Sequence, residues 1–233
     1  MAARGETILI LGGTAEAHAL ANTLMASGEA RVITSLAGRT AEPALPSGEV
    51  RIGGFGGVDG LIAYLRDQRI TRVIDATHPF ARRISENARL ASKAAGVPLE
   101  HVQRPEWHPE NGDLWTQVAS LEEAASALPA GARVFLALGR QYLKAFESRP
   151  DCHFVIRMVD PPLAPLDLPS HELVIGKPSA DKDTEGALFK EHGITHLVAR
   201  NSGGRASYGK IEAARKLAIP VILLSRLDNP HTP

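Results

Sequence analysis

A stretch near the start of the chain, Ile8-Leu9-Ile10-Leu11-Gly12-Gly13-Thr14-Ala15-Glu16, indicates its architecture. An apolar run ends in two glycines and a threonine, and a helical pattern begins directly after them. This order predicts a buried strand, a tight turn and a helix start, which is how α/β proteins build a phosphate site. Glycine lets the backbone approach a ligand, and the free N–H groups and dipole of a helix start favour an anion. The spacing departs from G-x-G-x-x-G, so a turn without a ligand stays the alternative.

The same alternation of strand and helix continues along the chain. In the first half, strands are expected at 31–35, 50–52, 73–76 and 97–102, and helices at 15–27, 58–68 and 81–95. In the second half, regular structure is expected to resume at 115–118, strands are expected at 133–138, 153–159, 172–175, 195–200 and 221–224, and helices at 121–128, 181–192 and 206–217. This pattern predicts an α/β protein with two Rossmann-like or flavodoxin-like domains and a cleft between them. Each domain is expected to be a mainly parallel sheet covered by helices.

The pattern breaks between residues 104 and 112. Two prolines, Pro105 and Pro109, and the pair Asn111-Gly112 make this crossing irregular. We therefore expect the first domain at 1–104 and the second at 105–233.

Composition excludes several classes of partner. Lys plus Arg and Asp plus Glu number 26 each, so no global basic field gathers nucleic acid or anionic membrane. No apolar run approaches the roughly 18 residues of a membrane span, and Met1 to Glu6 are not expected to form a secretory signal. The one cysteine, Cys152, excludes an intramolecular disulfide and fits a cytoplasmic location. The oligomeric state is not indicated.

The residues after the second expected strand suggest which dinucleotide binds. An acidic residue there would bind the adenosine ribose, whereas arginine suits a 2′-phosphate. This chain has Ser35-Leu36-Ala37-Gly38-Arg39 and no carboxylate before Glu42. If a dinucleotide binds, NADP(H) is expected, with Arg39 and Ser35 around its phosphate. A solvated loop arginine is the alternative for Arg39.

Two further segments belong to the same predicted site. The run Gly53-Gly54-Phe55-Gly56-Gly57 permits close backbone approach to a pyrophosphate or nicotinamide, or is only a flexible turn. The strand at 73–76 ends in Thr77-His78-Pro79, and strand carboxyl ends collect ligands in this architecture. Thr77 and His78 are therefore assigned to the first site, although a lone histidine is more often structural than catalytic.

The second half places three cations at or just past strand ends: Arg140, Lys177 and Arg200. Three cations at one edge repel each other unless they are solvated or neutralised by an anion. They are expected to bind a substrate with several carboxylates, and three solvated side chains are the alternative. No metal cluster, Ser-His-Asp order or Walker sequence is present. The residues alone thus indicate an NADP(H) enzyme acting on an anionic small molecule.

Six motifs in register along the chain resemble the precorrin-6A reductase family, NADPH-dependent reductases of corrin-ring biosynthesis. They are Leu11-Gly12-Gly13-Thr14-Ala15-Glu16-Ala17, Ser35-Leu36-Ala37-Gly38-Arg39, Gly53-Gly54-Phe55-Gly56-Gly57, Asp75-Ala76-Thr77-His78-Pro79-Phe80-Ala81, Gly139-Arg140-Gln141 and Asn201-Ser202-Gly203-Gly204. Arg200 departs from the family, where lysine is more often expected before the last motif. The charge is kept, so the departure concerns contact geometry rather than activity.

The resemblance implies hydride transfer from NADPH to a double bond of precorrin-6A, giving precorrin-6B, on a tetrapyrrole whose acetate and propionate groups suit a cationic wall. The expected cofactor-binding residues are Gly12, Gly13, Thr14, Ala15, Glu16, Ser35, Arg39, Gly54, Phe55 and Thr77. The expected substrate-binding residues are Arg140, Lys177, Arg200, Asn201, Ser202, Gly203 and Gly204. Asp160 and His78 are hypothetical proton donors, and solvent is the alternative. No metal site is expected in the protein.

Three alternatives stay open at this point. The chain is either a catalyst or a non-catalytic NADP(H)- or tetrapyrrole-binding protein. The third alternative is another NADPH-dependent reductase. A short-chain reductase or epimerase is disfavoured because no Tyr-x-x-x-Lys pair is present: neither Tyr142 nor Tyr208 has a lysine four residues later. The sequence also does not distinguish a metal-free substrate from a cobalt-loaded one.

Overall fold

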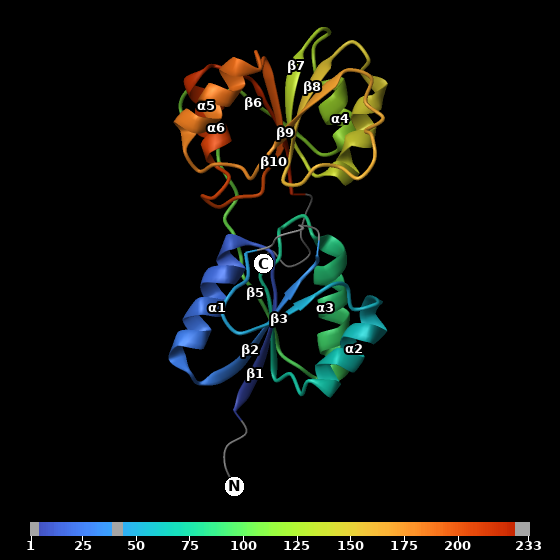
Figure 1. Ribbon diagram of the computed structural model, residues 1–233, viewed down its shortest axis with the longest axis vertical. Coiled ribbons are helices and arrows are strands. Elements are labelled where there is room, and N and C mark those ends of the chain that lie inside the picture. Colours follow the sequence, from blue (N-terminus) through green and yellow to red (C-terminus); the bar gives the residue numbers. More distant parts are fainter. Residues whose placement is uncertain (1–4, 39–43, 227–233) are drawn as a thin grey trace. The chain divides into compact units, whose positions relative to one another are not determined.

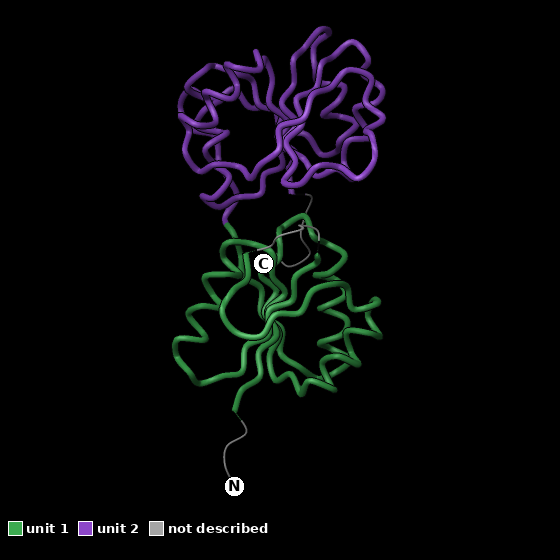
Figure 2. Tube along the Cα trace, in the orientation of Figure 1, with its two compact units in different colours: residues 1–104 green, residues 105–233 purple. Residues whose placement is uncertain are grey.

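The computed structural model describes residues 5–38 and 44–226 (Figure 1). The chain divides into two compact units, residues 1–104 and 105–233 (Figure 2). Each unit contains one sheet in which every strand pair is parallel. The predicted class, two parallel α/β domains, is confirmed.

The first unit is a five-stranded sheet with strand order β3-β2-β1-β4-β5. Its elements are β1 (Glu6–Leu11), α1 (Ala15–Ser27), β2 (Ala30–Leu36), β3 (Glu49–Ile52), α2 (Gly57–Asp67), β4 (Arg72–Asp75), α3 (Arg82–Ala95) and β5 (Leu99–His101). The chain leaves β1 toward β2 and β3 and later returns to β4 on the other side of β1. The strand order therefore reverses between β1 and β4, and ligands bind at such a point in open α/β sheets.

The core of the first unit follows from the alternation of side chains along β1. Ile8 and Ile10 pack with Ala17 and Ala21 of α1 on one face of the sheet. Leu9 and Leu11 pack on the other face with buried residues of α2 and α3, among them Leu61, Leu65, Ala88 and Ala91. An apolar run with no polar alternation is what a strand buried on both faces requires.

The second unit is a six-stranded sheet with strand order β6-β11-β10-β7-β8-β9. Its elements are β6 (Trp115–Val118), α4 (Leu121–Ser126), β7 (Arg133–Ala137), the 3₁₀ helix η1 (Arg140–Ser148), β8 (His153–Met158), β9 (His171–Ile175), α5 (Lys182–Glu191), β10 (His196–Arg200), α6 (Gly209–Lys216) and β11 (Val221–Leu224). The strand order reverses between β7 and β10, which makes their carboxyl ends the corresponding ligand position.

The helix η1 was not predicted from the sequence. It connects β7 to β8, and its buried Phe146 packs edge-on against Phe154 of β8 with ring centroids 5.7 Å apart. On the opposite face, Phe135 of β7 contacts Phe189 of α5 at 5.1 Å. Two parallel neighbours need a crossover over one face of the sheet, and η1 provides it in 3₁₀ form. None of the helices in the described residues is long and apolar enough to span a membrane.

Candidate functional site

The turn after β1 contains two glycines, and glycine is required at each of them for a different structural reason. The N–H of Gly12 donates to Ser35 O at 2.9 Å, and a Cβ at residue 12 would lie 2.8 Å from Thr34 Cγ2. Gly13 has a φ of +101°, which side chains rarely adopt, and a Cβ there would meet nothing within 4 Å. The first glycine lets β1 and β2 approach, and the second leaves the backbone uncovered. This backbone surface fits a phosphate group.

Thr14 joins the turn to the neighbouring strand end. Its Oγ1 accepts a hydrogen bond from the N–H of Ala17 at 3.1 Å and so caps α1. The same hydroxyl donates to the carbonyl of Ala76, just after β4, at 2.7 Å. One side chain therefore fixes both sides of the point where the strand order reverses.

The first turn of α1 contributes backbone rather than side chains. Ala15 is exposed, and Glu16 is half-buried. The Glu16 carboxylate forms an ion pair with Arg104, which offsets the negative charge that it brings to the helix start. The first N–H groups of a helix lack intrahelical partners and are free to bind an anion.

The end of β2 brings together Ser35 and an arginine that the sequence analysis did not single out. Ser35 is 7% exposed, and its hydroxyl accepts a hydrogen bond from Arg51 Nη1 at 2.9 Å. Arg51 lies on β3, opposite Ser35 in the pairing of the two strands. The predicted Arg39 lies outside the described residues.

The glycine run after β3 has its backbone held against this arginine. Nη1 of Arg51 donates to Gly53 O at 2.8 Å, and Nη2 donates to Gly54 O at 3.1 Å. The Phe55 ring lies under the guanidinium and contacts the Tyr64 ring edge-on at 5.2 Å. A Cβ on Gly60 of α2 would lie 1.8 Å from Phe55 O, so only glycine fits there. These contacts give the run a fixed conformation.

Thr77 and His78 follow β4, as the sequence indicated. The buried Asp75 accepts hydrogen bonds from the Thr77 N–H at 3.0 Å and from its hydroxyl at 2.7 Å. The His78 Nδ1 accepts from the N–H of Phe80 at 3.3 Å. Asp75 thus positions Thr77 at the carboxyl end of β4, and the half-buried His78 is held in the turn that starts α3.

In the second unit, the predicted cations follow the ends of three strands. Arg140 follows β7 and Lys177 follows β9, and both are exposed, whereas Arg200 ends β10 and is half-buried. The Arg200 guanidinium lies over the Tyr142 ring at 4.8 Å. Because all six strands are parallel, these residues share the carboxyl edge of one sheet.

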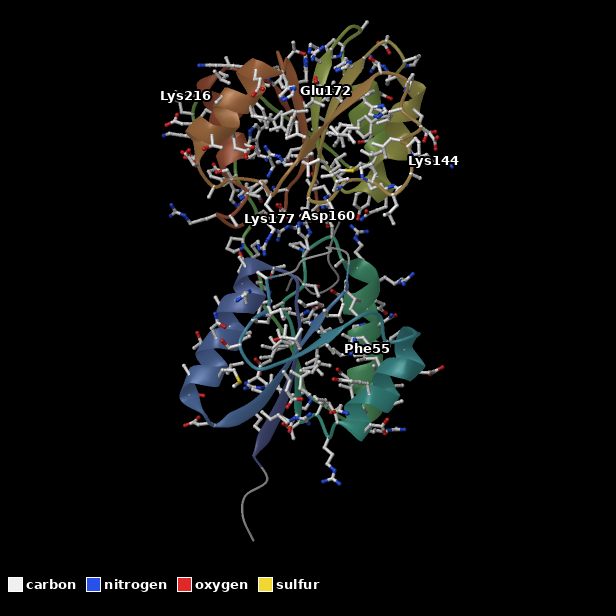
Figure 3. The ribbon with its side chains drawn as sticks, viewed as in Figure 1. Phe55, Lys144, Asp160, Glu172, Lys177 and Lys216 are labelled. Carbon is white, nitrogen blue, oxygen red and sulfur yellow. The ribbon has the colours of Figure 1, made fainter. Side chains whose placement is uncertain are left out.

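Asp160 belongs to the same edge. It lies two residues beyond Met158 of β8, which pairs with Ile175 of β9, and Lys177 lies two residues beyond Ile175. Figure 3 labels Asp160 and Lys177, which both lie at the edge of the sheet where β8 and β9 end. Asp160 and Lys177, which carry opposite charges, therefore follow adjacent strands at corresponding positions.

The loop at 201–204 is anchored by Trp107, another residue that the sequence analysis did not assign to the site. The Asn201 side chain accepts from the Trp107 N–H at 2.8 Å and donates to the Trp107 carbonyl at 2.9 Å. The Trp107 indole N–H donates to Gly204 O at 2.9 Å. Asn201 is 1% exposed, so its amide holds the loop in place, and Ser202 and Gly203 are also buried.

A buried lysine, Lys210, lies next to this loop. Its ammonium group donates to the carbonyl of Ser207 and lies 4.9 Å from the centre of the Trp107 ring. Burial lowers the pKa of Lys210 to about 7, with Glu185 opposing the shift and Arg157 and Arg200 adding to it. Glu185 itself pairs with Arg157 at 2.8 Å. No spacing in the sequence marks Lys210 as buried, since it follows Gly209 in an ordinary amphipathic pattern.

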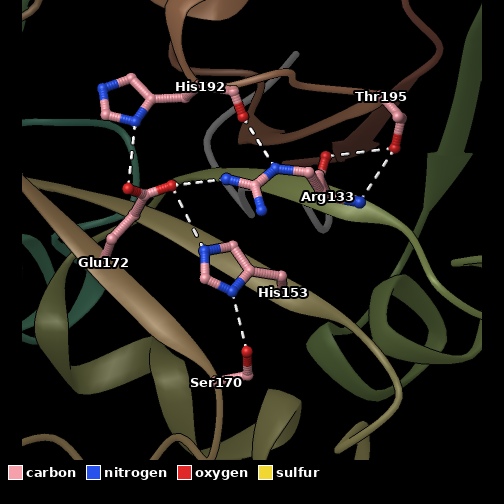
Figure 4. A network of polar contacts seen from close by, with 6 residues as sticks. All are labelled: Arg133, His153, Ser170, Glu172, His192 and Thr195. Carbon is pink, nitrogen blue, oxygen red and sulfur yellow. Dashed lines mark hydrogen bonds and ion pairs between the residues drawn. The ribbon is translucent and has the colours of Figure 1, made fainter.

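The opposite, amino edge of the second sheet carries a different polar network (Figure 4). The Glu172 carboxylate contacts Arg133 at 2.8 Å and His153 and His192 at 3.3 Å each. Burial raises the pKa of Glu172, but hydrogen bonds from His192 and His153 outweigh it, so the pKa lies below its ordinary value. Within the described ranges, no group of His, Cys, Asp or Glu is arranged to hold a metal ion. This network joins strand starts, away from the carboxyl edge.

Together these features define the class of the protein as a two-unit parallel α/β protein. Its first unit has a glycine turn of uncovered backbone after β1, and its second unit has cationic residues along its carboxyl edge. Comparison with known proteins gives the particular family. A family model described as "Precorrin-6x reductase CbiJ/CobK" matches residues 7–232, and the chain belongs to this family. The predicted resemblance is confirmed.

Individual relatives agree with this assignment. The chain is 51% identical to a precorrin-6A reductase from Sinorhizobium sp., over 97% of this chain and 87% of the relative. It is 30% identical to a cobalt-precorrin-6A reductase from Priestia megaterium, over 94% of this chain and 90% of the relative. A solved structure named "CobK precorrin-6A reductase" matches with a TM-score of 0.92 and 44% identity, covering 97% of this chain and 90% of the other.

Proposed function

We propose that this chain catalyses the NADPH-dependent reduction of a double bond of the precorrin-6A macrocycle, giving precorrin-6B, in cobalamin biosynthesis. The observation that carries the proposal is the match of almost the whole chain, in sequence and in fold, to precorrin-6A reductases. The reaction is an oxidoreduction of a CH–CH group in which a hydride and a proton are added.

The first unit is proposed to bind the cofactor. The uncovered backbone at Gly13, where a Cβ would enter open space, fits the pyrophosphate. We assign it the backbone of Gly12 and Gly13, the capped start of α1 at Thr14, and the N–H groups of Ala15 and Glu16. Bound NADPH supplies the hydride, and the protein supplies orientation and exclusion of water.

The remaining cofactor residues are assigned by their strand ends. Ser35 and Arg39, after β2, are proposed for the adenosine end, where an arginine suits a 2′-phosphate. The Gly54-Phe55 segment, held by Arg51, is proposed to cover the dinucleotide. Thr77, fixed by Asp75 after β4, is proposed to contact it across the reversal of strand order.

The second unit is proposed to bind the macrocycle. Precorrin-6A carries several carboxylates, and Arg140, Lys177 and Arg200 share one carboxyl edge. Charge-assisted hydrogen bonds to carboxylates are about twice as strong as neutral ones. The loop of Asn201, Ser202, Gly203 and Gly204 is proposed to bind beside these cations, with Asn201 acting through the shape of the loop because its amide is bonded to Trp107.

The proton donor is proposed to be Asp160 or His78. Asp160 lies among the proposed substrate cations, and His78 lies among the proposed cofactor residues. An Asp160→Asn or His78→Gln variant that removes the acid should lower kcat and leave NADPH binding unchanged. Unchanged kcat in either variant removes that residue from consideration.

The substrate is proposed to be free of cobalt. The relative named for precorrin-6A is more similar to this chain than the relative named for cobalt-precorrin-6A. A cytoplasmic location is part of the same proposal, because one cysteine and no disulfide suit a reducing compartment.

The test is an anaerobic assay of NADPH absorbance with precorrin-6A, cobalt-precorrin-6A or no macrocycle. The proposal expects NADPH loss with the metal-free macrocycle, slower loss with the cobalt form and none without a macrocycle. Binding of NADPH and macrocycle without oxidation of NADPH would instead identify a non-catalytic binding protein. Oxidation of NADPH by another anionic substrate, with precorrin-6A inert, would identify a different reductase.

A further inference from the structure

Arg51 holds a position at the carboxyl ends of the two strands that flank the proposed adenosine site. It lies on β3, and its strand partner is Ser35 of β2. Its side chain is fixed by three hydrogen bonds, to Ser35 Oγ at 2.9 Å, Gly53 O at 2.8 Å and Gly54 O at 3.1 Å. A guanidinium group held by this many bonds loses little further freedom on binding a ligand.

One face of the Arg51 guanidinium is covered by an aromatic ring. Its Cζ lies 3.8 Å from the centroid of the Phe55 ring and 5.1 Å from that of the Tyr64 ring, and the two rings contact each other edge-on. The absence of a side chain on Gly60 allows this packing, because a Cβ there would clash with Phe55 O. A planar guanidinium stacks on aromatic surfaces with either face, and adenine is such a surface.

The charge of Arg51 is not neutralised within the described part of the chain. The three acceptors of its hydrogen bonds are a hydroxyl and two carbonyls. Within the described residues, Arg51 forms no ion pair with a carboxylate. The neighbouring Arg31, on β2, is different, because it pairs with Glu49 at 2.6 Å. A guanidinium has five N–H donors, so the three bonds leave Nε–H and one Nη2–H, a fork that matches two oxygens of a phosphate.

We propose that Arg51 binds the 2′-phosphate of NADPH, with Ser35 beside it and Phe55 as its backing, and so determines the preference for NADPH over NADH. This inference rests on the proposed function and deepens it. It adds a strand residue of fixed geometry to Arg39, the loop residue expected from the sequence to bind the same phosphate.

The experiment is calorimetric titration with two ligands that differ only in the phosphate in question, adenosine 2′,5′-bisphosphate and adenosine 5′-monophosphate. It needs neither macrocycle nor turnover. The wild-type chain should bind the bisphosphate at least about tenfold more tightly, because only the bisphosphate can accept charge-assisted hydrogen bonds at its 2′-phosphate. Arg51→Met should lose most of that preference and keep its affinity for the monophosphate within about threefold.

Three further variants separate recognition from structure. Arg51→Gln removes the charge but keeps an N–H donor for the Gly53 carbonyl, and it should lose the preference as Arg51→Met does. Arg51→Lys keeps the charge without the fork and should retain part of the preference. Arg31→Met is the matched control, an arginine of the adjacent strand with a carboxylate partner, and it should leave the preference unchanged.

Equal loss of affinity for both ligands in Arg51→Met and Arg51→Gln would overturn the proposal, since it would mean that Arg51 only shapes the glycine run. Retention of the full preference for the bisphosphate in Arg51→Met or Arg51→Gln would also overturn the proposal. The same holds if the preference is lost in Arg39→Met and in none of the Arg51 variants. Failure of the proposed function is seen separately, as NADPH that is not consumed with any macrocycle. The preference for the bisphosphate is measured whatever that outcome is.

Discussion

The two sheets share the same order in five of their strands, to which the second adds β6, but their carboxyl edges differ in what they present to a ligand. In the first unit the edge consists largely of backbone, with glycines at the turn after β1 and in the run after β3. In the second unit the edge consists of long side chains, Arg140, Lys177 and Arg200. Backbone N–H groups suit a pyrophosphate, whose shape is constant. Long cationic side chains suit carboxylates spread around a macrocycle, whose positions they can follow.

The two edges are nevertheless fixed in the same way. In the first unit, Thr14 bonds to the carbonyl that follows β4. In the second unit, the Asn201 amide bonds to the Trp107 backbone, and the Trp107 indole N–H donates to the carbonyl of Gly204. A side chain from one segment thus satisfies the backbone of another at each reversal of strand order, as buried polar groups require. The difference between the edges therefore lies in the recognition groups, and variants of these groups test it.

The largest effect is expected from Gly13→Ala. The residue has a φ of +101°, where a side chain costs roughly 1–3 kcal/mol, and the new Cβ would enter the open space of the turn. We expect NADPH affinity to fall about 100-fold, from strain and from lost space together, with titration calorimetry as the measurement. The control is Gly139→Ala after β7, where φ is −73° and the Cβ meets only the movable end of Gln141. Equal effects of the two changes would contradict a backbone-built first site.

A smaller effect is expected from removing one cation of the second edge. Arg140→Met should raise the KM for precorrin-6A about tenfold at low salt and leave NADPH affinity unchanged, because the side chain is exposed and loses one charged contact. Steady-state kinetics at two salt concentrations measure both quantities. Lys216→Met is the matched control, since Lys216 is an exposed cation of α6 that pairs with Asp183. A rise in KM as large in the control would show that only net charge matters.

The sequence was sufficient for the strand–helix alternation and for the edge positions, because apolar runs and glycine turns are local signals. It did not identify Arg51, because a single arginine inside a short strand looks like an ordinary surface residue. Its importance arises from strand pairing with Ser35, which brings together residues that are 16 positions apart.

Trp107 and Lys210 were missed for a related reason. Trp107 lies in the irregular crossing, and its partner Asn201 is 94 residues away. Lys210 is a buried charge, which average burial statistics exclude for lysine. The helix η1 is not indicated by the sequence because it is a 3₁₀ helix, whereas apolar spacing indicates α-helices. Contacts that depend on tertiary packing are thus the part that periodicity does not encode.

The buried charge at the second edge gives a prediction on pH dependence. The folded pKa of Lys210, about 7, lies below the ordinary value of 10.5. The cost of burying the charge is therefore full below pH 7, and it is relieved as pH rises between the two values. Relative to Lys210→Met, the wild-type chain should gain stability by up to about 1.4 kcal/mol per pH unit in this window. Urea unfolding of both proteins from pH 7 to pH 9 measures the difference in their free energies of unfolding. If this difference does not change with pH, the lysine stays charged in the folded protein.

The smallest effect is expected at the amino edge of the second sheet. Glu172→Gln removes a carboxylate shared by Arg133, His153 and His192, but its side chain is 36% exposed, so solvent screening limits the loss to about 0.5–1 kcal/mol. Because the folded pKa of Glu172 is lowered, its contribution is present above the ordinary value of 4.5 and is lost as pH falls through the folded pKa. Thermal unfolding at neutral and acid pH measures the change. A raised KM for precorrin-6A in this variant would mean that the amino edge also takes part in binding.

The most direct test of the account follows the hydrogen itself. NADPH carrying deuterium at the transferable position of nicotinamide C4 is incubated with precorrin-6A and the protein, and the product is examined by mass spectrometry. We expect one deuterium atom from the cofactor in precorrin-6B. The second added hydrogen is a proton that originates from the solvent, so a reaction run in D₂O should introduce deuterium at that position. A product without deuterium from the cofactor, or NADPH oxidised with the macrocycle unchanged, would contradict it.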